Sequence, residues 1–271
     1  MTLDQIDTVV KGVRAQAGVA LDPTKVYAIE TRLNALARRE GFESLAELVE
    51  AFGADEGLMW RATEALTHSE TSFFRDRTPF HRFRDEMLPQ LQSRRDRPLR
   101  VWSAGCATGQ EAYSLAMMID EAQGAAPALR VELFASDLSE RRLEKARSGL
   151  YTQFEVQRGL PVRLLVRHFG PEGELWQVQP RLREMIRWRR LNLMAELKPV
   201  GHFDVIFCRN VLVMLDPEIR PKALERLARA LTPDGWLVLG REETATGVDT
   251  LEPVEGWAGA YARRGGLRAA A

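Results

Sequence analysis

The chain has 271 residues, and its 38 Lys and Arg balance its 38 Asp and Glu, which gives a formal net charge of zero. This balance provides no overall attraction to nucleic acid or to an anionic membrane. Hydrophobic residues make up 45% of the chain, enough to build the core of one large domain or two small ones. No apolar run approaches the roughly 18 residues of a membrane span, and no N-terminal signal is evident. We therefore expect a soluble cytoplasmic protein.

Cysteine and histidine give no sign of a disulfide framework or a metal centre. Cys106 and Cys208 lie in or beside predicted strands, where a small buried hydrophobe is the usual role of a cysteine. The four histidines have no HxxxH or CxxC context, so we expect no zinc or other metal.

The N-terminal part of the chain is predicted to be helical. Asp22-Pro23 is a typical N-cap and N1 pair, and apolar residues then recur at helical spacing until Gly41, which predicts a helix over 23–40. Two further helices are predicted before residue 68. We therefore predict an all-α N-terminal domain over residues 1–75.

Basic residues recur along the helix predicted over 23–40. They are Lys25, Arg32 and Arg39 at heptad spacing, with Arg38 alongside. Heptad spacing keeps such residues on one face of a helix. This basic face has two interpretations: a solvated surface, which is the usual reason for the pattern, or a docking surface for an acidic partner helix.

Residues 76–271 show the pattern of an α/β domain with a mainly parallel sheet. Strands are expected near 100–104, 131–136, 203–208, 236–240 and 258–262, and helices near 110–123, 139–148 and 217–231. The alternation breaks over about 152–190, where short strands flank the loop Gly170-Pro-Glu-Gly173 and another lies over 185–191. We predict a small antiparallel β insertion there.

The most informative stretch is Arg100–Ser114, in which a short strand leads through small residues into a helix. Gly105 and its small neighbours let the backbone approach a ligand closely. Asp137 ends the next predicted strand, where a carboxylate can accept hydrogen bonds from a ribose; alternatively, it caps the following helix. The loop matches neither GxGxxG nor a P-loop, which favours a nucleoside without a pyrophosphate, such as S-adenosylmethionine.

Several blocks of the sequence resemble those of the chemotaxis receptor methyltransferase family, CheR. They follow one another over nearly the whole chain: Thr71–Asp76, Arg100–Ser114, Ala135–Ser139, Ala146–Tyr151, Leu191–Leu193 and Phe203–Val211. The resemblance implies an α/β fold class, a Rossmann-like class I SAM-dependent methyltransferase with an all-α N-terminal domain and a small antiparallel β insertion. It also implies methyl transfer from S-adenosyl-L-methionine to glutamate side chains of chemoreceptors. The products would be a glutamyl methyl ester and S-adenosyl-L-homocysteine, with no metal involved.

The resemblance also implies roles for particular residues. Ser69, Thr71 and Arg75 match the segment that closes over the methionine end of the cofactor; Gly105 and Glu111 match the glycine-rich loop and the acid after it; Asp137 matches the ribose acid; Asn192 with Leu193, and Arg209 with Asn210, match segments that line the adenine and the reaction centre.

The chemistry itself requires positioning more than activation. A glutamate carboxylate is ionised at neutral pH, so methyl transfer needs no general base; the protein must align the carboxylate and remove its water. Arg75 is the candidate catalytic residue, because a guanidinium holds a carboxylate in a fixed fork. The alternatives are a surface arginine for Arg75 and a structural ion pair with Asp204 for Arg209.

The sequence departs from the family pattern at three places. Met214-Leu215 stand where Tyr-Phe is common, Ser69 stands where Asn is frequent, and the Gly170–Gly173 loop is shorter than that of members that bind a receptor's C-terminal pentapeptide. We therefore expect a pentapeptide-independent enzyme. The alternatives are a cofactor-binding regulatory protein with little turnover, suggested by Met214, and a methyltransferase for another protein.

The expected partner is the cytoplasmic helical bundle of chemoreceptors, which is locally acidic because it carries glutamates. The contact would be made by the basic face of Lys25, Arg32, Arg38 and Arg39. We expect a monomer without nucleic acid partners and without direct membrane insertion.

Overall fold

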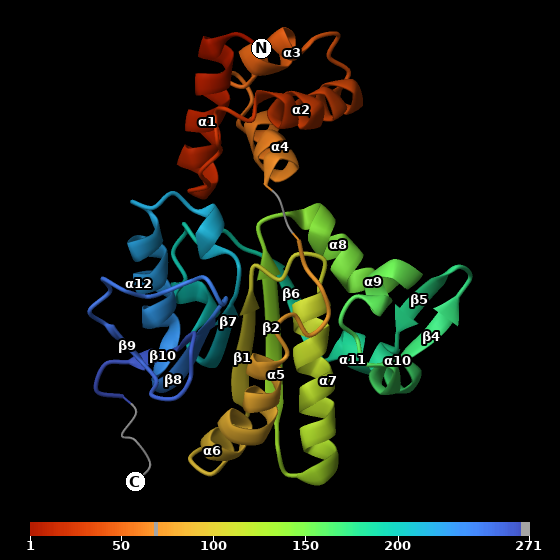
Figure 1. Ribbon diagram of the computed structural model, residues 1–271, viewed down its shortest axis with the longest axis vertical. Helices are drawn as coiled ribbons and strands as arrows, with labels where there is room; N and C mark the ends of the chain where they lie inside the picture. The colour runs from red at the N-terminus through yellow and green to blue at the C-terminus, as the bar shows by residue number, and fades with distance from the viewer. Residues whose placement is uncertain (68–69, 267–271) are drawn as a thin grey trace.

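The N-terminal region of the computed structural model is helical, as predicted (Figure 1). The structure describes residues 1–67 and 70–266. The helices of the first range are α1 (Leu3–Ala17), α2 (Val26–Glu40), α3 (Leu45–Ala51) and α4 (Glu56–Leu66). The second helix begins at Val26 rather than at residue 23, because the backbone of Lys25 is not helical, with ψ +43°. Asp22 accepts hydrogen bonds from the amide and hydroxyl of Thr24, in a separate turn before the helix.

A seven-stranded sheet forms the centre of the rest of the chain, in the order β6-β2-β1-β7-β8-β10-β9 (Figure 1). Its strands are β1 (Leu99–Ala104), β2 (Val131–Asp137), β6 (Ile186–Arg190), β7 (Phe203–Cys208), β8 (Leu231–Leu239), β9 (Leu251–Pro253) and β10 (Ala260–Arg263). The first five in spatial order are parallel, and β10 is antiparallel to both of its neighbours. The predicted α/β class with a mainly parallel sheet is confirmed.

One predicted strand belongs to a different sheet than expected. The sequence pattern predicts that the stretch over 185–191 belongs to the insertion, but as β6 it pairs in parallel with β2 and forms an edge of the main sheet. Its sequence alternates apolar and charged residues over Ile186-Arg-Trp-Arg189, which fits an edge strand with one face packed and the other exposed. Trp188 accordingly packs on Tyr113 of the neighbouring helix, with ring centroids 5.5 Å apart.

Helices pack on the sheet from both sides. They are α5 (Thr78–Arg82), α6 (Leu88–Gln92), α7 (Gln110–Ala125), α8 (Glu140–Ser148) and α12 (Arg220–Ala230), with a π-helical turn over Phe83–Met87 and 3-10 turns over Lys198–Val200 and Leu212–Met214. Side chains alternate across a strand, so Val101 of β1 faces the core around α7, whereas Trp102 faces the core around α12. The latter core continues into α1–α4, which joins the N-terminal helices to the sheet.

The insertion contains a second, antiparallel sheet in the order β3-β5-β4. Figure 1 shows β4 and β5 of this sheet apart from the main sheet. Its elements are β3 (Leu150–Thr152), α9 (Gln153–Gln157), α10 (Val162–His168), β4 (Phe169–Glu172), β5 (Leu175–Val178) and α11 (Pro180–Glu184). The loop expected over Gly170–Gly173 is mostly strand, because β4 extends to Glu172 and only two residues, Gly173 and Glu174, turn the chain into β5. Gly173 has φ +59°, as such tight hairpin turns require.

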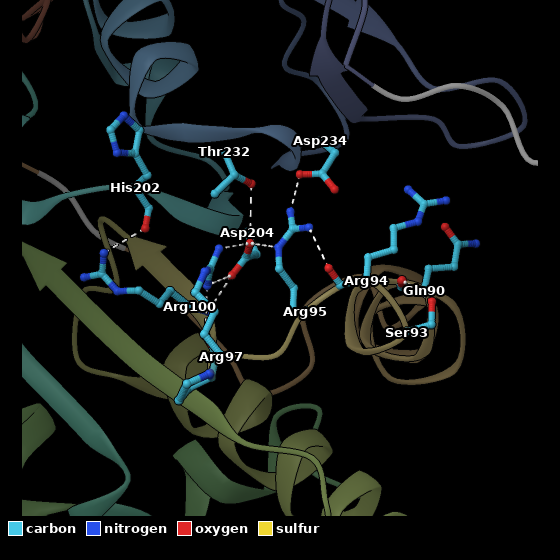
Figure 2. Close-up of polar contacts among 11 residues, drawn as sticks. Gln90, Ser93, Arg94, Arg95, Arg97, Arg100, His202, Asp204, Thr232 and Asp234 are labelled. Carbon is cyan, nitrogen blue, oxygen red and sulfur yellow. Dashed lines mark hydrogen bonds and ion pairs between the residues drawn. The ribbon is translucent and has the colours of Figure 1, made fainter.

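Asp204, near the start of β7, anchors the segment before β1 (Figure 2). Its buried carboxylate accepts hydrogen bonds of 2.8 Å from the Arg97 guanidinium and from the amide of Arg100. Burial raises the pKa of Asp204, but these hydrogen bonds and the charges of Arg97 and Arg95 outweigh burial and hold the pKa below its ordinary value. The alternative pairing of Arg209 with Asp204 is therefore wrong, since Arg209 follows the opposite end of β7.

Candidate functional site

A cavity of about 310 Å³ lies at the carboxyl ends of β1, β2 and β7, the edge where parallel α/β sheets bind ligands. The predicted site residues that line it are Thr71, Arg75, Gly105, Glu111, Asp137, Asn192, Leu193, Arg209 and Asn210. Ser69 lies outside the described residues. Residues separated by more than a hundred positions in the sequence thus meet at one edge of the sheet.

The loop after β1 is held close to the wall of this cavity. Gly105 has φ +73°, and a Cβ atom there would lie 2.4 Å from Cγ2 of Val211, so only glycine fits. The amides of Gly105 and Cys106 both donate to the carbonyl of Ser136 at the end of β2. These backbone hydrogen bonds therefore fix the loop to the end of β2.

Asp137 connects this loop to the end of β2. Its carboxylate accepts hydrogen bonds of 2.9 Å from the amides of Ala107 and Ser139, and Nη1 of Arg142 lies 3.5 Å away. The N-cap of α8 is Ser139, so the alternative in which Asp137 caps that helix is wrong. Asp137 is only 5% exposed and contributes to the cavity wall.

The segment Thr71–Asp76 is anchored by two buried rings. Phe73 packs edge-on against Tyr151 and Phe169, and the Phe74 amide donates to Oγ of Ser114. Between these anchors and α5, Arg75 faces the cavity, and its Nη1 donates to the carbonyl of Glu70 at 2.9 Å. Arg75 therefore lines the cavity instead of starting a surface helix, since α5 begins only at Thr78.

A charged cluster around the buried Arg209 lies beside the cavity. The side chain of Arg209 is 1% exposed; its Nη2 lies 2.7 Å from Asp76, and its Nη1 lies 3.6 Å from Glu111. Glu111 also accepts a hydrogen bond of 2.8 Å from Ser103. Burial raises the pKa of Glu111, and the Arg209 charge and the Ser103 hydroxyl oppose that shift. The guanidinium of Arg209 thus joins the segment before α5 to the start of α7.

The N-terminal helices close one side of the cavity. The side-chain amide of Asn192 donates to the carbonyl of Gln16 near the end of α1 at 2.7 Å. The chain after α1 also pairs with the segment after β7. The amide of Ala20 donates to the carbonyl of Met214, and the amide of Asp216 donates to the carbonyl of Gly18. The cavity wall therefore includes residues that sequence reasoning missed: Ala17, Val19, Glu70, Arg142 and Glu242.

These omissions have a common origin. Ala17 and Val19 follow a helix far from the glycine-rich loop in sequence, and nothing local indicates that they meet it. Arg142 differs from the other missed residues because a local signal for it exists. It lies in the first turn of the helix after Asp137, within reach of that carboxylate.

Other classes of site are absent from the described residues. No group of three His, Cys, Asp or Glu side chains in residues 1–67 and 70–266 is arranged to hold a metal ion. Within the same ranges, no helix combines the length and the apolarity that crossing a bilayer demands.

Comparison with known proteins identifies the family. Residues 69–257 match the family model described as "CheR methyltransferase, SAM binding domain". The chain belongs to the CheR methyltransferase family. It is therefore an S-adenosylmethionine-dependent methyltransferase, and the class I fold expected from the sequence is confirmed.

Named relatives span most of the chain. Chemotaxis protein methyltransferase 1 of Pseudomonas aeruginosa is 38% identical over 233 residues, 83% of this chain and 85% of that protein. Chemotaxis protein methyltransferase Cher2 of Pseudomonas putida is 35% identical over 238 residues, 85% of this chain and 86% of that protein. The chemotaxis protein methyltransferase of Vibrio parahaemolyticus is 36% identical over 246 residues, 89% of each chain.

Proposed function

We propose that this CheR-family enzyme methylates glutamate side chains of chemoreceptors in the cytoplasm and forms glutamyl methyl esters. The observation that carries the proposal is the meeting of the glycine-rich loop, Asp137 and Arg75 around one cavity. An anchored loop and a strand-end carboxylate suit a nucleoside, and an arginine beside them suits an anionic substrate.

The cavity residues fit S-adenosylmethionine. Asp137 would accept hydrogen bonds from the ribose, and Leu193, with Asn192 beside it, would cover the adenine. Thr71 and Arg75 would hold the methionine end, as would Ser69. Gly105, Cys106 and Ala107 all line the cavity, so the loop would be part of the binding surface.

The protein's own contribution to methyl transfer is positioning. The bound cofactor supplies an activated methyl group, and an ionised glutamate is already a nucleophile. Arg75 would hold the substrate carboxylate with its remaining N–H donors, while Phe73 and Phe74 fix the segment that carries it. Closing the cavity would remove water from the carboxylate.

The receptor would dock on the basic face of α2. Lys25, Arg38 and Arg39 are exposed, as a docking surface requires. Arg32 is only partly exposed, and its Nη1 donates to the carbonyl of Leu66 at the end of α4. We assign Arg32 a structural part in this face, because it caps the helix that leads into the cavity wall. The enzyme would act as a monomer on the helical bundle.

We further propose that the enzyme does not depend on a receptor's C-terminal pentapeptide. The β4–β5 connection is a two-residue turn, Gly173-Glu174, which leaves little backbone beside the small sheet for capturing an added strand. A titration with such a pentapeptide is expected to show no binding at micromolar concentration.

A methyl-transfer assay tests the main proposal. Receptor-containing membranes are incubated with the purified enzyme and cofactor carrying a tritiated methyl group, and the label is then exposed to mild base. Label on the receptor band that is released by base indicates a carboxyl ester. Base-stable label, or no label on any receptor, contradicts the proposal. The same assay is run with Asp137→Asn, which removes a charge from the cavity. This variant is expected to transfer much less label than the wild type.

A further inference from the structure

We propose that Glu243 is a positioning residue for cofactor binding, although its side chain lies behind the cavity wall. Glu243 is 7% exposed. One carboxylate oxygen, Oε2, accepts hydrogen bonds of 2.7 Å from the amides of Asn210 and Gly240; the other, Oε1, accepts one of 3.1 Å from the amide of Val213. This group of four residues is the Glu243 clamp. It ties the segment after β7 to the end of β8.

The clamp holds a segment that needs support. Asn210 has φ +60°, a left-handed conformation that is uncommon outside glycine, although asparagine adopts it more readily than most residues. Such conformations persist where the surroundings enforce them. Two of the three hydrogen bonds that the Glu243 carboxylate accepts come from the turn that begins at Asn210 and ends near Met214. Hydrogen bonds to an ionised acceptor are stronger than those between neutral groups, so the carboxylate is suited to this task.

The clamped turn is itself part of the cavity. Asn210, Val211, Val213 and Met214 all line it, and Val211 is the side chain that packs on the glycine-rich loop at Gly105. A shift of the turn would therefore move both the wall and the loop against which the cofactor is proposed to lie.

Gly240 shows how tightly the clamp is packed. A Cβ atom there would lie 2.7 Å from Oε2 of Glu243 and 2.9 Å from the amide nitrogen of Asn210. The second contact is with backbone, so a methyl group at position 240 would displace the clamp without removing its charge. Position 240 thus offers an independent way to disturb the same element.

This inference rests on the proposed cofactor site. It predicts how the loss of Glu243 changes the affinities for the cofactor and for its demethylated product. Glu243 would act by shaping the cavity, so its loss would weaken S-adenosylmethionine and S-adenosylhomocysteine by similar factors. A direct charge interaction would instead weaken the positively charged S-adenosylmethionine more than the neutral product.

The experiment is calorimetric titration of full-length Glu243→Gln and Gly240→Ala with both ligands, beside thermal unfolding. Glutamine keeps the size of the side chain but replaces one acceptor oxygen with a donor, so we expect each affinity to fall about tenfold. Gly240→Ala is expected to give a similar loss. Asp204→Asn is the matched control, because Asp204 is also a buried carboxylate that accepts a backbone amide, at the other end of β7. It should lower the melting temperature and leave both affinities unchanged.

Three outcomes would overturn the inference: wild-type affinities in Gly240→Ala or in folded Glu243→Gln, a loss in Glu243→Gln that is much larger for S-adenosylmethionine than for S-adenosylhomocysteine, or an equal loss of affinity in Asp204→Asn. If Glu243→Gln does not fold, Gly240→Ala decides. A failure of the proposed site is recognised separately, since wild-type protein would then not bind S-adenosylhomocysteine, or Asp137→Asn would bind it normally.

Discussion

At the scale of single residues, Arg75 allows the sharpest test of the methyl-transfer proposal. Its side chain lines the cavity, and its segment is anchored by Phe73 and Phe74. Arg75→Ala is therefore expected to slow methyl transfer about 10²–10³-fold, the usual effect of removing one preorganised electrostatic partner, with little change in melting temperature. Arg77→Ala is the control, because Arg77 is exposed and lies only two residues further along the chain. Near-normal transfer by Arg75→Ala, or an equal loss in Arg77→Ala, would remove Arg75 from the reaction.

Individual residues also show which contacts can be predicted from sequence patterns. Asp137 was placed at the end of a strand beside a glycine-rich loop, and the structure brings the two within hydrogen-bonding distance. Both lie close to strand ends, and strand ends are predictable from local periodicity. The partners of Arg209 were not predictable, because Asp76 and Glu111 reach it from two segments far away in sequence.

At the scale of elements, α2 is expected to act as a receptor-docking helix. The double variant Arg38→Glu and Arg39→Glu should raise the KM for receptor several-fold at low salt, since single exposed charge pairs are weak but act together. The effect should shrink as salt is added, and the affinity for S-adenosylhomocysteine should stay unchanged. Arg32 is left intact because its hydrogen bond to Leu66 supports α4.

A control helix separates docking from general electrostatics. Lys222→Glu with Arg229→Glu makes the same change of charge on α12, where both side chains are exposed. This variant is expected to keep the wild-type KM for receptor. If the KM for receptor rises equally in both double variants, or does not rise in the α2 variant, the basic face is only a solvated surface.

At the scale of the whole molecule, His168 is expected to make stability depend on pH. Its ring is fully buried where the insertion meets α7, and neither ring nitrogen has a hydrogen-bond partner within the described residues. Burial lowers the pKa of His168; the charge of Asp120 opposes the shift, and those of Arg167 and Arg181 add to it. The unfolded chain therefore binds this proton at a higher pH than the folded chain does. The stability that neutral His168 contributes is present above about pH 6.5 and is lost as pH falls through the lowered pKa.

Thermal unfolding tests this dependence. The melting temperature of the wild type should drop between about pH 7.5 and about pH 5.5, and His168→Leu, which cannot titrate, should show a smaller drop. His81→Leu is the control, because His81 is exposed on α5, and it should retain the wild-type drop. Equal drops in the wild type and His168→Leu would show that His168 does not contribute.

The sequence by itself determined the family, the positions of β1, β2 and β7 along the chain and nine of the residues that line the cavity. These features depend on local patterns: periodicity, a glycine-rich turn and an acid at a strand end. The tertiary structure alone decided which sheet takes β6, which carboxylates meet Arg209, how α1 reaches Asn192, and that Glu243 holds the turn after β7. Each of these depends on contacts between segments far apart in the chain. Their geometry is set when strand ends converge at one edge of the sheet, and no local pattern encodes that convergence.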